Sequence, residues 1–138
     1  MNTFFSATPL WQNAGLTLIR FILGIFLIYH GLEIFDEAKM NEYITWDPFK
    51  NSSGRFMVYA GKAAELCAGI FFVLGLFTRL ASLIIIMTFL YISFFLGNGK
   101  IWYEDQHPFL FVLLALVFFF TGPGSFSLDK IIFRSRTK

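Results

Sequence analysis

The chain has 138 residues, of which 57% are hydrophobic and 14% are charged, whereas a soluble domain carries about 25% charged residues. This balance excludes a soluble monomer, because a chain of this length cannot hide so many apolar side chains behind its own surface. The formal net charge of +2 gives no argument for a nucleic-acid partner. The single cysteine excludes an intrachain disulfide and a cysteine metal cluster, and no metal site is expected.

Four apolar segments follow one another along the chain, at about residues 14–35, 56–78, 80–97 and 107–122. At about 1.5 Å per residue, a helix of about twenty residues reaches across a hydrocarbon core of about 30 Å. A membrane span must satisfy its own backbone hydrogen bonds, and these segments lack the alternation of barrel strands. The sequence therefore predicts an all-α fold, in which residues 1–138 form a single integral membrane four-helix bundle.

The connections between these segments differ in length. Segment 36–55 is longer than an ordinary connection, so we expect an outer loop that folds over one mouth of the bundle. The second and third helices are separated by little more than Phe77-Thr78-Arg79 and should form a tight antiparallel hairpin. Gly122-Pro123-Gly124 ends the fourth helix, and residues 123–138 form a basic tail.

Four crossings would place both termini and the turn at Arg79 on one side of the membrane. That side carries five basic residues and one acid, and the other side carries four basic residues and six acids. The five are Arg79, Lys130, Arg134, Arg136 and Lys138. Because loops rich in lysine and arginine stay in the cytoplasm, both termini are predicted to be cytoplasmic.

Ionisable residues inside the apolar segments are the candidates for function, since an ion near the bilayer centre costs at least about 2.5–3.5 kcal/mol. If the first two helices run antiparallel, Lys62 lies at the depth of His30 and Glu65 lies one turn deeper. We therefore predict a polar pocket of His30, Lys62 and Glu65, with Glu33 and His107 near its outer rim. The alternatives are that Lys62 and Glu65 only neutralise each other and that His30 is a hydrogen-bonded packing residue.

Three further charges are predicted to be structural or interfacial: Arg20, Arg79 and Asp129. Arg20 shares a helix face with Gly24 and should lie near Asp129 or a lipid phosphate. Cys67 is expected to be a small buried residue.

Three sequence segments carry a family resemblance: LIRFILGIFLIYHGLEIF from Leu18, AAELCAGIFFVLGLFTRLAS from Ala63 and TGPGSFSLDKII from Thr121. From Ala14 to Ile132, the chain resembles the DoxX family of small four-helix bacterial membrane proteins. The resemblance implies a location in the bacterial cytoplasmic (inner) membrane. Some members are similar to the membrane subunit of a thiosulfate to quinone oxidoreductase, and others associate with oxidative-stress enzymes.

We therefore predict a multi-pass protein that binds quinone or lipid as a subunit of a membrane redox complex. Quinone is the candidate cofactor: His30 or Lys62 would donate to its carbonyl oxygens and Glu65 would relay protons. No catalytic residue is assigned, and electrons would come from a partner, because one cysteine holds neither an iron–sulfur cluster nor a redox disulfide.

The expected partners are the lipid bilayer and either redox subunits or further copies of this chain, without nucleic acid. The main alternative is a non-enzymatic membrane anchor, assembly factor or scaffold. A small transporter ranks below it, because four short helices enclose only a small cavity unless the protein oligomerises. A haem bridged by His30 and His107 also ranks below it, because neither histidine lies in a distinctive ligand motif.

Overall fold

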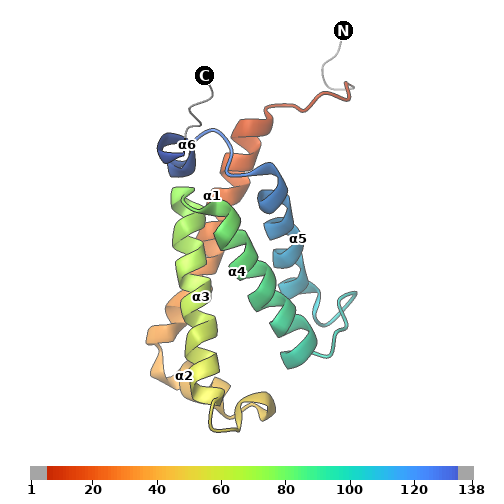
Figure 1. The fold of residues 1–138 in the computed structure, drawn as a ribbon. Coiled ribbons are helices and arrows are strands. Elements are labelled where there is room, and N and C mark those ends of the chain that lie inside the picture. Colours follow the sequence, from red (N-terminus) through yellow and green to blue (C-terminus); the bar gives the residue numbers. More distant parts are fainter. Residues whose placement is uncertain (1–5, 134–138) are drawn as a thin grey trace.

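The computed structural model describes residues 6–133, and that part of the chain forms helices without a strand (Figure 1). Residues 134–138, the end of the predicted basic tail, lie outside the described residues, as do residues 1–5. The long helices are α1 (Gln12–Gly31), α3 (Gly54–Leu74), α4 (Thr78–Tyr91) and α5 (Gln106–Thr121). The shorter elements are η2 (Leu32–Phe35), α2 (Glu37–Ile44), η3 (Asp47–Phe49), the π-helical η4 (Ile92–Leu96) and α6 (Leu128–Ile132).

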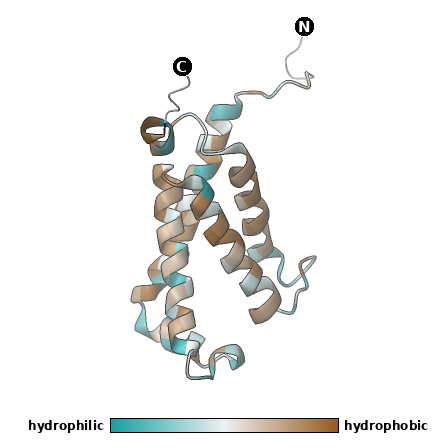
Figure 2. Cartoon of the chain, viewed as in Figure 1, coloured by the Kyte–Doolittle hydropathy of each residue, from teal (hydrophilic) through white to brown (hydrophobic). Residues whose placement is uncertain are grey.

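Within residues 6–133, three helical segments are long and apolar enough to cross a membrane: Gln12–Phe35, Gly54–Leu74 and Thr78–Leu96. Helix α5 is also apolar, but its 16 residues extend only about 24 Å. Figure 2 shows hydrophilic residues gathered in the loops and hydrophobic residues along the long helices. The all-α membrane fold is confirmed, whereas the fourth crossing stays a prediction.

The four long helices alternate in direction, so that the start of α1, the α3–α4 turn and α6 lie at one end of the molecule (Figure 1). The turn between α3 and α4 needs three residues, Gly75 to Phe77. Gly75 ends α3 with φ +64° and Phe77 begins α4 with φ +48°. The left-handed conformation at Gly75 closes the last turn of α3 and makes a tight hairpin.

Glycines set the close approach of α1 and α3. A Cβ atom added at Gly31 would lie 2.5 Å from the backbone of Leu66, and one added at Gly24 would lie 2.8 Å from the backbone nitrogen of Val73. Small residues permit this contact, which is a common means of packing helices in lipid. The core continues into α4 and α5. In it, the ring centres of Phe72 on α3 and Phe118 on α5 are 5.3 Å apart.

Segment 36–55 folds into α2 and η3 and covers the end of the bundle opposite the termini (Figure 1). Asp36 caps α2 by accepting hydrogen bonds from the backbone of Ala38 and Lys39. A small second core of Met40, Phe49 and Val58 fastens the segment to α3. The predicted outer loop is therefore a folded cover.

Candidate functional site

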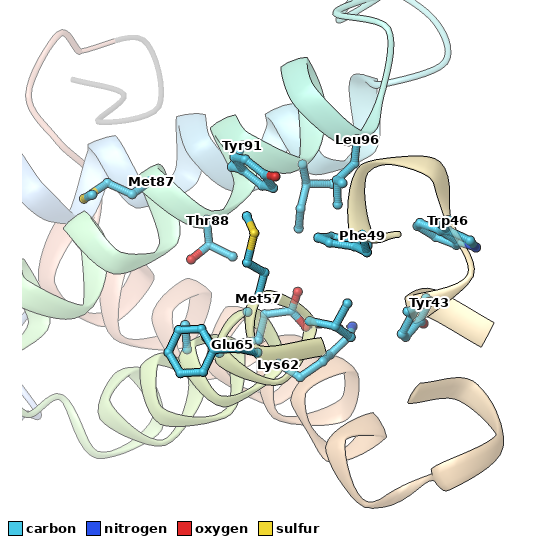
Figure 3. Close-up of a pocket in the computed structure, with 16 residues that line it drawn as sticks. Tyr43, Trp46, Phe49, Met57, Lys62, Glu65, Met87, Thr88, Tyr91 and Leu96 are labelled. Atoms are coloured by element: carbon cyan, nitrogen blue, oxygen red, sulfur yellow. Dashed lines mark hydrogen bonds and ion pairs between the residues drawn. The ribbon is translucent and has the colours of Figure 1, made fainter. Parts of the chain in front are cut away.

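The first candidate site is a cavity of about 560 Å³ between α3, α4 and the cover of α2 and η3, which we call the α3–α4 pocket (Figure 3). Its walls are mostly apolar and aromatic, and its polar groups come from Tyr43, Lys62, Glu65, Thr88 and Tyr91. The apolar lining residues include Trp46, Phe49, Phe56, Met57, Val58, Met87, Ile92 and Leu96. The size and the few polar groups are typical of a site for a small organic ligand.

The wall that α3 contributes carries an ion-pair network. The ammonium of Lys62 lies 3.0 Å from a carboxylate oxygen of Glu65 and 2.9 Å from one of Glu33. The side chain of Glu65 is only 4% exposed, while those of Lys62 and Glu33 are 15% and 13% exposed. The network therefore places one positive and two negative groups in a mostly apolar interior, where each needs the others for charge compensation.

Glu33 extends the network to α2. Its second carboxylate oxygen accepts a bond from Lys39 at 2.9 Å, and the oxygen shared with Lys62 accepts one from the Tyr43 hydroxyl at 2.7 Å. Burial and the bond to Glu33 raise the pKa of Tyr43 above its ordinary value, and the same carboxylate raises the pKa of Lys39. At neutral pH, Tyr43 is therefore a neutral donor and Lys39 a cation, and both hold α2 against η2.

The structure divides the predicted pocket of His30, Lys62 and Glu65. Lys62 and Glu65 come together, but His30 lines a different cavity. The reason is the helical step of 100° per residue: the stripe that ends in Gly31 packs against α3, so the preceding residue faces sideways, away from the α3–α4 pocket. Sequence reasoning missed Tyr43, because its segment shows no helical or strand periodicity. Its contact with Glu33 therefore could not be predicted from the spacing of residues along the chain.

That second cavity, about 670 Å³ between α1 and α5, is called the α1–α5 groove. His30 and His107 lie in it with their ring centres 6.3 Å apart. The rest of its lining is apolar apart from Tyr29: Ile19, Ile22, Leu23, Ile25, Phe26, Leu110, Phe111 and Leu114. Within residues 6–133, neither imidazole forms a hydrogen bond with another protein group.

Arg20 and Asp129 lie at the other end of the bundle, where they hold the carboxyl-terminal segment. Arg20 is 2% exposed and donates to the carbonyl oxygens of Pro123 at 2.7 Å and Phe126 at 2.5 Å. Asp129 accepts from the backbone nitrogens of Phe77 at 2.6 Å and Thr78 at 2.8 Å, and so caps α4. Among the described residues, the two charges do not form an ion pair; they fix the same segment through backbone groups.

Two other residues that the sequence singled out, Arg79 and Cys67, are both exposed. Arg79 is exposed in the first turn of α4, as an interfacial charge would be. Cys67 is also exposed, on the outer surface of α3, so its prediction as a buried residue is wrong. It faces away from Ala68 and Gly69, which form the packed side of that helix.

Comparison with known proteins gives the family. The DoxX family model matches residues 15–98, from α1 to just beyond η4. The chain belongs to the DoxX family. The matched segment contains Glu33, Lys62 and Glu65, whereas His107 and Asp129 lie beyond it. An uncharacterized protein of Haemophilus influenzae is 30% identical over 127 residues, which cover 86% of the present DoxX chain and 91% of that relative. No solved structure matches this DoxX protein.

Proposed function

We propose that this DoxX protein is a quinone- or lipid-binding subunit of a membrane redox complex, with the α3–α4 pocket as its binding site. The observation that supports this most is the combination of largely apolar walls with the buried pair of Lys62 and Glu65 on one of them. A quinone needs an apolar slot for its ring and tail and a donor at a carbonyl oxygen, and a lipid needs a related arrangement for its chain and headgroup.

The chemistry of Lys62 fits the role of donor. An ammonium has three N–H groups, and two carboxylates, Glu33 and Glu65, lie beside it. One N–H is therefore left for an oxygen of the ligand. Thr88 and Tyr91 line the wall that α4 supplies and offer hydroxyl groups to a second oxygen. Glu65 supplies a group that can exchange a proton with the reduced form of a quinone.

Electrons for such a ligand would come from a partner subunit, since the chain has a single cysteine. We place the protein in the bacterial cytoplasmic membrane with four crossings and both termini in the cytoplasm. In that orientation the α3–α4 pocket and its cover lie toward the outer side of the membrane. Helix α5 is shorter than the hydrocarbon core is thick, so local thinning of the bilayer would let it cross.

The test is purification from native membranes, followed by extraction and mass spectrometry of bound quinones and lipids. A short-chain ubiquinone analogue is then titrated into the delipidated protein, its Lys62→Met and Glu65→Gln variants, and a control, Lys100→Met. Lys100 forms an exposed pair with Glu104 outside the pocket. We expect quinone in the extract and weaker binding to the two pocket variants than to the control. Binding that is absent, or equal in all four proteins, would contradict the quinone site; a phospholipid alone in the extract would leave the lipid form of the proposal.

A non-enzymatic anchor or scaffold is the second candidate, and a specific observation favours it. Glu33, Lys62 and Glu65 already satisfy one another without a ligand, as structural charges that fix helix register would do. In that case Glu65→Gln would change stability but not the assembly of partner proteins. Copurification of the same partners with wild type and variant, without bound quinone, would support this function over the first.

A further inference from the structure

The α1–α5 groove contains both histidines of the chain, from helices far apart in sequence. We propose that this groove binds a metalloporphyrin of the haem class, with His30 and His107 as the two axial ligands of its iron. The inference is independent of the proposed function, because the groove and the α3–α4 pocket share no lining residue.

The separation of the two rings agrees with axial ligation. A first-row metal binds an imidazole nitrogen at about 2.0–2.1 Å, and that nitrogen lies about 1.1 Å from its ring centre, so two rings on opposite sides of one metal have centres about 6.2–6.4 Å apart. The centres of His30 and His107 are 6.3 Å apart. The angle of 66° between the ring planes is compatible, because two axial bonds leave the rings free to rotate about the common axis.

The imidazoles are also available for coordination. Within the described residues, neither ring donates or accepts a hydrogen bond, and their neighbours are the aromatic rings of Tyr29 and Phe111. His30 is half-buried and His107 is exposed, so a ligand can reach both rings. A bound metal would give each ring the partner that the protein does not provide.

The number of ligands favours a porphyrin over a bare ion. No group of three or more His, Cys, Asp or Glu residues suited to a metal ion occurs among residues 6–133, and a structural zinc site takes four protein ligands. A haem iron receives four nitrogens from its own macrocycle and takes only axial ligands from the protein. The two histidines therefore suffice for haem and fall short for zinc.

The shape and lining of the groove suit a flat apolar macrocycle. Its volume of about 670 Å³ is within the usual range for cofactor sites. Side chains on both walls, among them Phe26 of α1 and Leu110 of α5, remain exposed in the isolated chain. An inserted macrocycle would cover apolar surface of this kind, while its edge could stay in contact with lipid.

The experiment is a haem titration of the full chain in detergent micelles, followed by absorption and electron paramagnetic resonance spectroscopy. We expect a low-spin, six-coordinate iron in the wild type. His30→Gln and His107→Gln should each give a five-coordinate, high-spin species and weaken binding at least about tenfold. Lys100→Met, which changes an exposed pair outside both cavities, is the control and should keep the wild-type spectrum. Circular dichroism verifies that each variant is folded, and His30→Met and His107→Met provide folded alternatives that change the ligand and hence the spectrum.

Three results would overturn the proposal. The first is a wild-type spectrum without six-coordinate iron, and the second is equal haem affinity in wild type and both glutamine variants, which indicates partition of haem into the apolar surface. The third is saturable binding of Zn²⁺ or Cu²⁺ alone that depends on both histidines, in a protein that does not ligate haem iron. None of these results bears on quinone in the α3–α4 pocket, so the two proposals fail separately.

Discussion

The buried pair of Lys62 and Glu65 allows a stability prediction of defined size. Glu65 is 4% exposed, and the ammonium of Lys62 is its one ion-pair partner among residues 6–133. Lys62→Met removes that ammonium while keeping a side chain of similar length. Because removal of one member of a buried pair costs about 3–5 kcal/mol, we expect the free energy of unfolding to fall by about that amount at neutral pH.

The loss arises from the carboxylate that remains, so it should be reversed by a second change. In the double variant Lys62→Met with Glu65→Gln, no unpaired charge is left at this position, and replacement of a whole ion pair by neutral groups is often close to neutral in stability. We therefore expect the double variant to recover most of the loss. Glu33 is not left alone in either variant, since Lys39 and Tyr43 still contact it.

The assay is equilibrium unfolding of the full chain in detergent micelles, followed by far-ultraviolet circular dichroism. The matched control is Lys100→Met, which breaks an exposed pair whose side chains are 57% and 48% accessible and should cost no more than about 1 kcal/mol. Equal losses for Lys62→Met and Lys100→Met would refute the reasoning. A double variant less stable than Lys62→Met would refute it as well, because it would show that the unpaired carboxylate is not the cause.

The remaining predictions concern three other contacts. Gly31→Ala places a Cβ 2.5 Å from the backbone of α3 and should cost about 1–3 kcal/mol in thermal unfolding, whereas Gly61→Ala, with nothing within 4 Å, should leave the melting temperature unchanged or raised. Asp129→Asn weakens the cap of α4 and should cost about 0.5–2 kcal/mol; proteolysis should then release the carboxyl-terminal segment faster, and an unchanged rate would contradict its role. The raised pKa of Tyr43 means that its bond to Glu33 contributes stability below the ordinary tyrosine pKa and loses it as pH rises through the higher value. A tyrosinate absorbance titration should therefore show a late phase that Tyr43→Phe abolishes, and persistence of that phase would assign it elsewhere.

The sequence was sufficient for the helices because hydropathy and helix punctuation are local properties. Long apolar runs predicted the membrane helices, and the short separation of the second and third runs predicted the hairpin between α3 and α4. The turn itself lies at residues 75–77, earlier than the predicted Phe77-Thr78-Arg79. The proximity of Lys62 and Glu65 was also local, since residues three apart share a helix face. The end of α5 is local as well, because Gly122 follows its last residue, Thr121.

The rest of the site depends on how helices are rotated against each other, which one sequence does not contain. His30 was assigned to the side of Lys62 on depth alone, but the close contact of Gly31 with Leu66 turns the histidine toward α5. The partners of Arg20 were missed for a different reason. They are carbonyl oxygens of the carboxyl-terminal segment, and a pattern of charged side chains does not show where backbone acceptors lie.

The cover of α2 and η3 was the least predictable part. Its packing sets Met40 and Phe49, from a segment without helical or strand periodicity, against Val58 of α3. The bond between Tyr43 and Glu33 follows from that packing. The pairing of Lys62 and Glu65 on α3 could therefore be predicted from the sequence, whereas the packing of the cover over the α3–α4 pocket could not.

The central claim is that the α3–α4 pocket is the place where this DoxX protein holds an amphipathic ligand. Photolabelling with a photoreactive quinone analogue in native membranes, followed by peptide mapping, tests it most directly. We expect labels on pocket residues such as Met57 of α3 and Met87 of α4, and we expect excess unlabelled quinone and Glu65→Gln to reduce them. Labels confined to surface residues away from both cavities, such as Phe120, without competition by unlabelled quinone, would contradict it.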